Sequence, residues 1–159
     1  MLRSARVELV VDVRSFARSR SNPVYNVDTL PARLAGVRID YRHMPELGGR
    51  RGRQPDVPEE INAGWRNASF HNYADYALSD EFAHGLVGLV ALGRSRHVAL
   101  MCAEAVWWRC HRRIIADHLM LDGHEVVHLM GDGREDAARP TPGVRRTGEG
   151  LVVYPAAPA

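Results

Sequence analysis

Short apolar runs alternate with amphipathic stretches along the first 130 residues of the chain. Residues 7–13 form a nearly continuous β-branched run, and 37–42, 97–101 and 125–129 are further short runs of strand-forming residues. Uninterrupted apolar runs of this length are typical of strands buried on both faces of a parallel sheet. The pattern therefore predicts four strands.

Helical spacing and end signals fill the segments between these runs. They predict helices over 29–35, 73–78, 80–93 and 107–122, the third of them capped by Asp80. Strands that alternate with helices argue for an α/β chain with right-handed crossovers. We therefore expect a single-domain, Rossmann-like three-layer fold with a mainly parallel sheet.

The same pattern suggests how the chain is divided. The α/β domain is expected to span residues 1–130. Within it, residues 45–67 are rich in Gly, Pro and charge, which predicts a long flexible flap. Residues 131–159 are expected to form a loosely ordered C-terminal tail, with one candidate strand at 151–154.

The basic residues are all arginine: the chain has 21 of them and no lysine. This excludes Schiff-base and other lysine chemistry, whereas the planar guanidinium suits phosphate and carboxylate. An arginine-favouring coding bias is the alternative cause of the overall count. The positions of the arginines are more informative than their number, because the first 53 residues hold eleven arginines and only five acidic residues. The positive charge is local.

No apolar stretch is long enough for a membrane-spanning helix, and the N-terminus lacks the apolar centre of a signal peptide. The two cysteines are too few for the disulfide framework of a secreted domain. The expected compartment is the cytoplasm, where both cysteines would be thiols.

Polar residues follow the predicted strands, and in open α/β sheets ligands bind at the carboxyl ends of the strands. Arginines, hydroxyls and a thiol would meet there, and arginines near a helix N-terminus would add anion-binding groups. The predicted substrate-binding residues are Arg14, Ser15, Arg18, Ser19, Arg20, Arg42, Cys110 and Arg112.

Cys102, Glu104 and His111 are the predicted catalytic residues. Cys102 ends a strand and precedes a helix, where the helix dipole favours a thiolate. Glu104 and His111 are seven residues apart, so on a continuous helix they would share a face and could transfer protons. The match to a cysteine-phosphatase loop is weak, because Trp108 stands where its arginine would be and Arg109 comes one position later.

Two alternatives accompany this catalytic set. Cys102 could equally be a small buried residue at the end of a core strand. Cys102, Glu104 and His111 could also hold a metal ion, but their spacing is not diagnostic and the sequence has no zinc-type cysteine pairs. No metal is therefore predicted.

Several runs together resemble a widespread bacterial family. They are Val11-Asp12-Val13-Arg14-Ser15-Phe16, Ser19-Arg20-Ser21-Asn22-Pro23, Leu47-Gly48-Gly49-Arg50, Cys102-Ala103-Glu104 and Cys110-His111-Arg112-Arg113. The family is the domain of unknown function DUF488, and the resemblance extends to about Leu129. It implies a Rossmann-like domain with a polar pocket formed by these runs, and no established reaction. Family members usually begin with a further strand and helix, which the resemblance implies are lacking here.

These observations favour an enzyme, a hydrolase or a transferase, that acts on a phosphate-bearing or nucleotide-like substrate. They do not indicate which cofactor, if any, it uses. The alternative is a non-catalytic nucleic-acid-binding module in which the same arginines track a phosphate backbone while Trp65 or Trp107 stacks a base. A third interpretation assigns the runs to packing and leaves the function to a partner protein.

Overall fold

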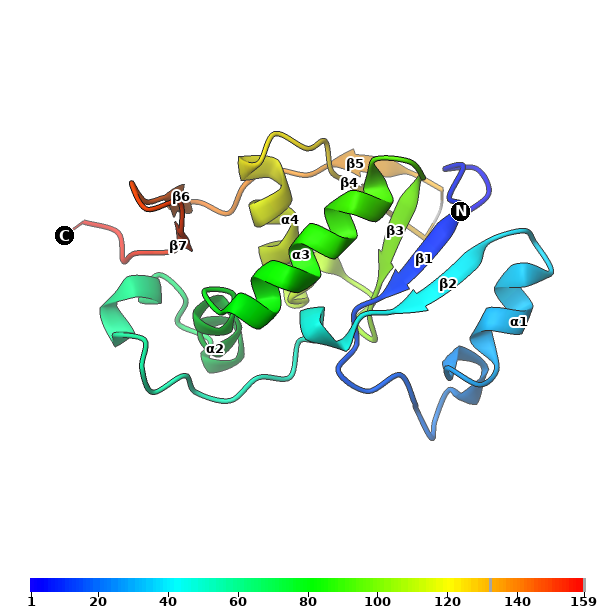
Figure 1. Cartoon of the computed structure of the whole chain (residues 1–159), viewed down its shortest axis with the longest axis horizontal. Helices are drawn as coiled ribbons and strands as arrows, with labels where there is room; N and C mark the ends of the chain where they lie inside the picture. The colour runs from blue at the N-terminus through cyan, green and yellow to red at the C-terminus, as the bar shows by residue number, and fades with distance from the viewer. Residues whose placement is uncertain (132, 159) are drawn as a thin grey trace.

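The computed structural model describes residues 1–131 and 133–158. Its centre is a three-stranded parallel sheet with the order β2-β1-β3 (Figure 1). The strands are β1 (Leu9–Asp12), β2 (Asp40–His43) and β3 (Val98–Met101). β1 is the central strand, and all four of its residues are buried because apolar clusters cover both of its faces. Three of the four predicted strands therefore form one parallel sheet.

The helices lie on both sides of these strands. They are α1 (Leu30–Ala35), α2 (Ala68–Tyr76), α3 (Asp80–Gly93) and α4 (Arg112–Leu121). In Figure 1 the sheet separates α1 from α3 and α4. Val10 packs with the apolar residues of α1, whereas Leu9 and Val11 belong to a larger core with the other helices. Alternate residues of β1 thus serve two cores, as the pleat of a strand requires.

Three helices differ from the prediction at an end. α2 runs from Ala68 to Tyr76, whereas the predicted helix covers 73–78. Ser79, not Asp80, caps α3, because its hydroxyl accepts the Phe82 N–H. The predicted helix over 107–122 is wrong in its first part: Trp107–Arg109 is a 3₁₀ turn, and α4 begins only at Arg112. Cys110 between them is extended, with φ −126° and ψ 144°.

The fourth predicted strand does not join the parallel sheet. β4 (Val127–Leu129) pairs antiparallel with β5 (Glu135–Ala137), and a second hairpin joins β6 (Arg145–Arg146) to β7 (Val152–Val153). The candidate strand at 151–154 is thus present as β7. Its neighbour Tyr154 is buried, and its hydroxyl donates to Asp117 at 2.9 Å.

Residues 45–67, which were expected to form a flap, pack against the rest of the protein near both of their ends. It contains two 3₁₀ turns, Pro45–Leu47 and Glu59–Asn62. Leu47 and Asn62 are fully buried, and Asn62 donates to Asp75 of α2 at 2.8 Å. Within the described residues, no helix has the length and apolar character that crossing a membrane demands.

Candidate functional site

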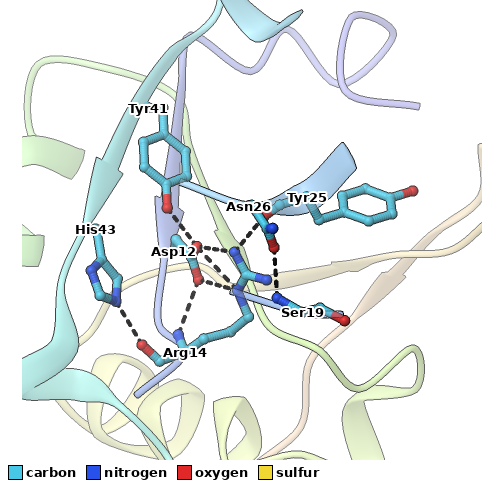
Figure 2. Close-up of polar contacts among 7 residues, drawn as sticks. All are labelled: Asp12, Arg14, Ser19, Tyr25, Asn26, Tyr41 and His43. Carbon is cyan, nitrogen blue, oxygen red and sulfur yellow. Dashed lines mark hydrogen bonds and ion pairs between the residues drawn. The ribbon is translucent and has the colours of Figure 1, made fainter. Parts of the chain in front are cut away.

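Asp12 and Arg14 form a buried ion pair at the carboxyl end of β1 (Figure 2). Arg14 Nε donates to Asp12 Oδ1 at 2.9 Å, its Nη2 donates to Oδ2 at 2.6 Å, and Tyr41 Oη also donates to Oδ2 at 2.6 Å. The hydrogen bond to Asp12 raises the pKa of Arg14, and burial raises the pKa of Tyr41. One cation, one anion and one neutral phenol therefore satisfy each other below the loop that follows β1.

Arg14 also holds this loop in place. Its Nη2 donates to the Tyr25 carbonyl oxygen, and its own carbonyl oxygen accepts from His43 Nε2, both at 2.7 Å. The Ser19 N–H donates to Asn26 Oδ1 at 2.6 Å across the same loop (Figure 2). Arg14, predicted to bind substrate, is buried and bonded to the protein, so its placement is that of a positioning residue.

An open hollow of about 890 Å³ lies over the loop that follows β1. Guanidinium groups, a hydroxyl, an amide and an aromatic ring line it. The lining residues are Phe16, Arg18, Ser19, Arg20, Pro23, Asn26 and Arg50. Three of the residues predicted to bind substrate, Arg18, Ser19 and Arg20, thus lie together.

None of the described residues that line this hollow is acidic. Arg18 pairs with Asp28 at 2.5 Å, and both side chains are largely exposed. For Arg20 and Arg50, the described part of the chain provides no acidic partner. Phe16 is 70% exposed, and the Arg50 guanidinium lies 6.0 Å from its ring centroid. The hollow therefore combines free positive charge with an accessible ring.

Ser15 and Arg42 are outside this lining. Ser15 Oγ accepts the backbone N–H of Arg50 at 2.9 Å, so it supports the loop that carries a lining arginine. Arg42 is exposed on β2 and lines a different hollow of about 410 Å³ beside α1. The structure does not bring Arg42 together with the other predicted arginines.

Cys102, Cys110 and His111 form a compact cluster between β3 and α4. His111 Nδ1 lies 3.8 Å from Cys102 Sγ and 3.7 Å from Cys110 Sγ. The three atoms are all within 4.8 Å of one another. Cys110 is only 1% exposed, whereas Cys102 is partly exposed.

Backbone contacts fix the ring of His111. Its Nε2 donates to the Val13 carbonyl oxygen at 2.9 Å, which leaves the lone pair of Nδ1 directed at the sulfurs. A Cβ on Gly49 would come within 2.3 Å of Nδ1 and 2.6 Å of Cγ, so only glycine fits against this ring. Tyr73 packs edge-on against the ring, with centroids 4.9 Å apart.

The thiolate of this cluster belongs on Cys110. The hydrogen bond from the Cys102 thiol and the charge of Arg112 lower the pKa of Cys110 to about 6. The same hydrogen bond, together with burial, raises the pKa of Cys102 to about 12. Cys110, predicted only to bind substrate, is therefore the more acidic thiol of the pair.

Arg112 supports this thiolate and closes the loop before it. Its Nε lies 3.2 Å from Cys110 Sγ, and its Nη2 donates to the Glu104 carbonyl oxygen at 2.6 Å. Through these contacts the Arg112 side chain is bonded to atoms of the protein itself. The Glu104 side chain is exposed, and the break at Cys110 separates it from α4. The helix face predicted for Glu104 and His111 is therefore wrong, because no continuous helix joins them.

The loop at 48–50 connects the hollow to the cluster. Gly48 packs on Ser15, where a Cβ would approach to 2.6 Å, and Gly49 packs on His111. Arg50, the next residue, lines the hollow. The Gly48-Gly49-Arg50 run stands out in the sequence, but neither Gly49 nor Arg50 was among the predicted site residues. Their contacts depend on loop geometry, and the only signal was the glycine pair beside an arginine.

The loop before α4, the 48–50 loop and the end of β1 are the segments that carried the resemblance noted in the sequence. A family model described as domain of unknown function DUF488 matches residues 1–119. The chain belongs to this family. No curated protein and no solved structure matches the chain. The DUF488 match brings no named reaction, so the function has to be argued from the site.

Proposed function

We propose that this DUF488 protein is an enzyme, a hydrolase or a transferase, that acts on a phosphate-bearing small molecule. The arginines of the hollow hold the anion, and the Cys102–Cys110–His111 cluster is the reactive centre. The observation that carries the proposal is the 48–50 loop. Gly49 packs on His111, and the adjacent Arg50 lines the hollow.

The hollow favours a phosphate group because Arg20 and Arg50 have no acidic partner in the described residues. Guanidinium groups bind phosphate oxygens through charge-assisted and bidentate hydrogen bonds. Exposed Phe16 provides an aromatic face beside Arg50, which suits the base of a nucleotide. A mononucleotide is therefore the first substrate class to test.

The cluster supplies groups suited to acid–base or nucleophilic chemistry. Cys102 is the member that a substrate can reach, since Cys110 is almost fully buried. His111 Nδ1 lies 3.8 Å from Cys102 Sγ, where it can accept the Cys102 proton. In the metal-free protein Cys102 is thus the candidate nucleophile. A catalytic role for Glu104 remains a prediction.

In the nucleic-acid-binding alternative, Trp65 or Trp107 stacks a base, but both rings are already stacked on other rings of the protein. Trp65 is stacked on Phe70 at 4.8 Å between ring centroids, and Trp107 is stacked on His128 at 4.2 Å. A ring already stacked within the protein offers one face fewer to a base. We therefore place this function second.

The test measures thermal stabilisation by mononucleotides and by short oligonucleotides at low and moderate salt. We expect a mononucleotide to stabilise the protein at both salt concentrations. Arg20→Gln and Arg50→Gln should each weaken its affinity by at least about 10-fold, the loss expected for one charge-assisted hydrogen bond. Arg42→Gln, at an exposed arginine outside the hollow, is the matched control and should bind normally. Stabilisation by oligonucleotides alone, abolished by salt, would instead support nucleic-acid binding.

A further inference from the structure

We infer that Cys102, Cys110 and His111 bind a soft divalent metal ion such as Zn²⁺ through two sulfurs and one imidazole nitrogen. This inference deepens the proposed function, because the ion would be the reactive centre beside the arginine hollow. It differs from the metal set suggested by the sequence, in which Glu104 stood in place of Cys110.

The two sulfur–nitrogen separations are close to those around a tetrahedral ion. With Zn–S bonds of about 2.3 Å and Zn–N bonds of about 2.0 Å, a tetrahedron places sulfur and nitrogen ligands about 3.5 Å apart. The two sulfur–nitrogen distances here are 3.8 and 3.7 Å. They are nearly equal, whereas a single S–H···N hydrogen bond would draw one sulfur closer than the other. The two sulfurs, which lie within 4.8 Å of each other, would have to be about 3.8 Å apart around the ion, so a contraction of at most about 1 Å completes the geometry.

His111 has the orientation of a metal ligand. Its Nε2–H is donated to the Val13 carbonyl oxygen, which fixes the tautomer with a free lone pair on Nδ1. Metal-binding histidines commonly donate their second ring nitrogen to a carbonyl or carboxylate in this way. Gly49 adds a steric constraint, because it leaves the ring no room to turn towards the 48–50 loop.

The sulfurs also have outer partners. Arg112 approaches Cys110 Sγ with its backbone N at 3.5 Å and its Nε at 3.2 Å. N–H groups directed at a thiolate stabilise its charge without occupying the position of the ion. Two thiolates balance a divalent cation, and Arg112 also bonds to the Glu104 carbonyl oxygen, which anchors the loop from 102 to 110.

Cys102, Cys110 and His111 leave the fourth coordination position of the ion open. Among the described residues, the histidine, cysteine and acidic side chains that converge here are only these three. Structural zinc sites are usually closed by four protein ligands, whereas catalytic sites have three and leave one position for water or substrate. Cys102 is partly exposed, so this position can be reached from solvent.

The test titrates the reduced, chelator-treated full chain with Co²⁺, which reports thiolate ligands by charge-transfer absorption, and then displaces it with Zn²⁺. We expect one ion per chain and the spectrum of a tetrahedral thiolate site. Cys110→Ser and His111→Asn should weaken affinity by at least about 100-fold, beyond the loss caused by removing an outer partner. Glu104→Gln is the matched control and should bind as the unmodified chain does.

A second measurement requires no variant, so misfolding cannot imitate its result. Stoichiometric Zn²⁺ should slow alkylation of Cys102 in the reduced protein by at least about 10-fold, because a bound thiolate is no longer a free nucleophile. Absent charge-transfer bands together with unchanged alkylation would overturn the metal site. Nucleotide stabilisation that depends on Arg20 would remain after that result, so failure of the metal site is distinct from failure of the proposed function.

Discussion

Glycine at position 49 is required by its neighbour, not by a turn. Its backbone lies against the His111 ring, and any Cβ would overlap Nδ1 and Cγ. Because Nε2 of the same ring is bonded to the Val13 carbonyl oxygen, the ring cannot swing away without losing that bond. The position of the imidazole therefore depends on the absence of one methyl group.

Gly49→Ala should lower the free energy of unfolding by about 1–3 kcal/mol, the usual cost of overpacking a tight site. Urea denaturation measures this change. Gly52→Ala is the matched control, since a Cβ there meets nothing within 4 Å, and it should change stability by less than about 0.5 kcal/mol. Equal effects of the two substitutions would contradict the packing of Gly49 on His111.

His118 determines part of the pH dependence of stability. It is buried on α4, and its Nε2 has no hydrogen-bond partner among the described residues. Burial lowers the pKa of His118 to about 4, and the charge of Arg146 acts in the same direction. In the unfolded chain the pKa of a histidine is about 6.5. At pH values between the folded and the unfolded pKa, the unfolded chain therefore binds more protons than the folded chain. Stability is therefore complete above the unfolded pKa and is lost as pH falls towards 4.

We expect the free energy of unfolding to fall by about 3 kcal/mol between pH 7 and pH 4 through His118 alone. His118→Leu removes this titration, whereas Asp117 and His128, whose pKa values are also shifted by burial, remain in both proteins. Urea denaturation over this pH range should give a flatter profile for the variant. Parallel profiles for the two proteins would show that His118 is not held neutral by burial.

At the scale of elements, the end of β1 and its loop carry two ion pairs with different roles. The Asp12–Arg14 pair is buried beneath the loop, and the Arg18–Asp28 pair is exposed on it. Removing one member of a buried pair leaves the other charge without compensation. Exposed pairs contribute little, because water already solvates both charges.

Arg14→Leu should therefore lower stability by about 3–5 kcal/mol, because Asp12 would stay buried with Tyr41 as its main partner. Arg18→Leu, the control on the same loop, should cost less than about 1 kcal/mol. The comparison is made by chemical denaturation at neutral pH. A small loss for Arg14→Leu would mean that this pair does not hold the loop that follows β1.

The elements also show which predictions depend on local signals. The strands at β1 and β3 were predictable because their β-branched and apolar runs are continuous, and Cys102 follows from the end of β3. Arg18, Ser19 and Arg20 line one hollow because they are adjacent in the chain. The break at Cys110 was not predictable, since it accompanies contacts between distant residues, such as Trp107 on His128 and Arg112 on the Glu104 carbonyl oxygen.

At the scale of the whole molecule, a small parallel sheet brings three distant segments to one edge. The end of β1 contributes Val13 and the loop of the hollow, β3 contributes Cys102, and the start of α4 contributes His111. The convergence of polar groups at strand ends was predictable from the α/β pattern. The pairing of β4 with β5, outside that sheet, was not, because it depends on residues beyond 130. The Rossmann-like three-layer arrangement remains a prediction.

We propose that the arginine hollow and the Cys102–Cys110–His111 cluster form one site. The most direct measurement is the rate of Cys102 alkylation in the reduced, metal-free protein with and without a saturating mononucleotide. At 90% occupancy the rate should fall by about 10-fold in the unmodified chain and in Arg42→Gln, whereas at the same nucleotide concentration it should fall by no more than about 2-fold in Arg20→Gln, whose affinity is weaker. A nucleotide that raises the melting temperature but leaves the alkylation rate unchanged would contradict the claim, because hollow and cluster would then be separate.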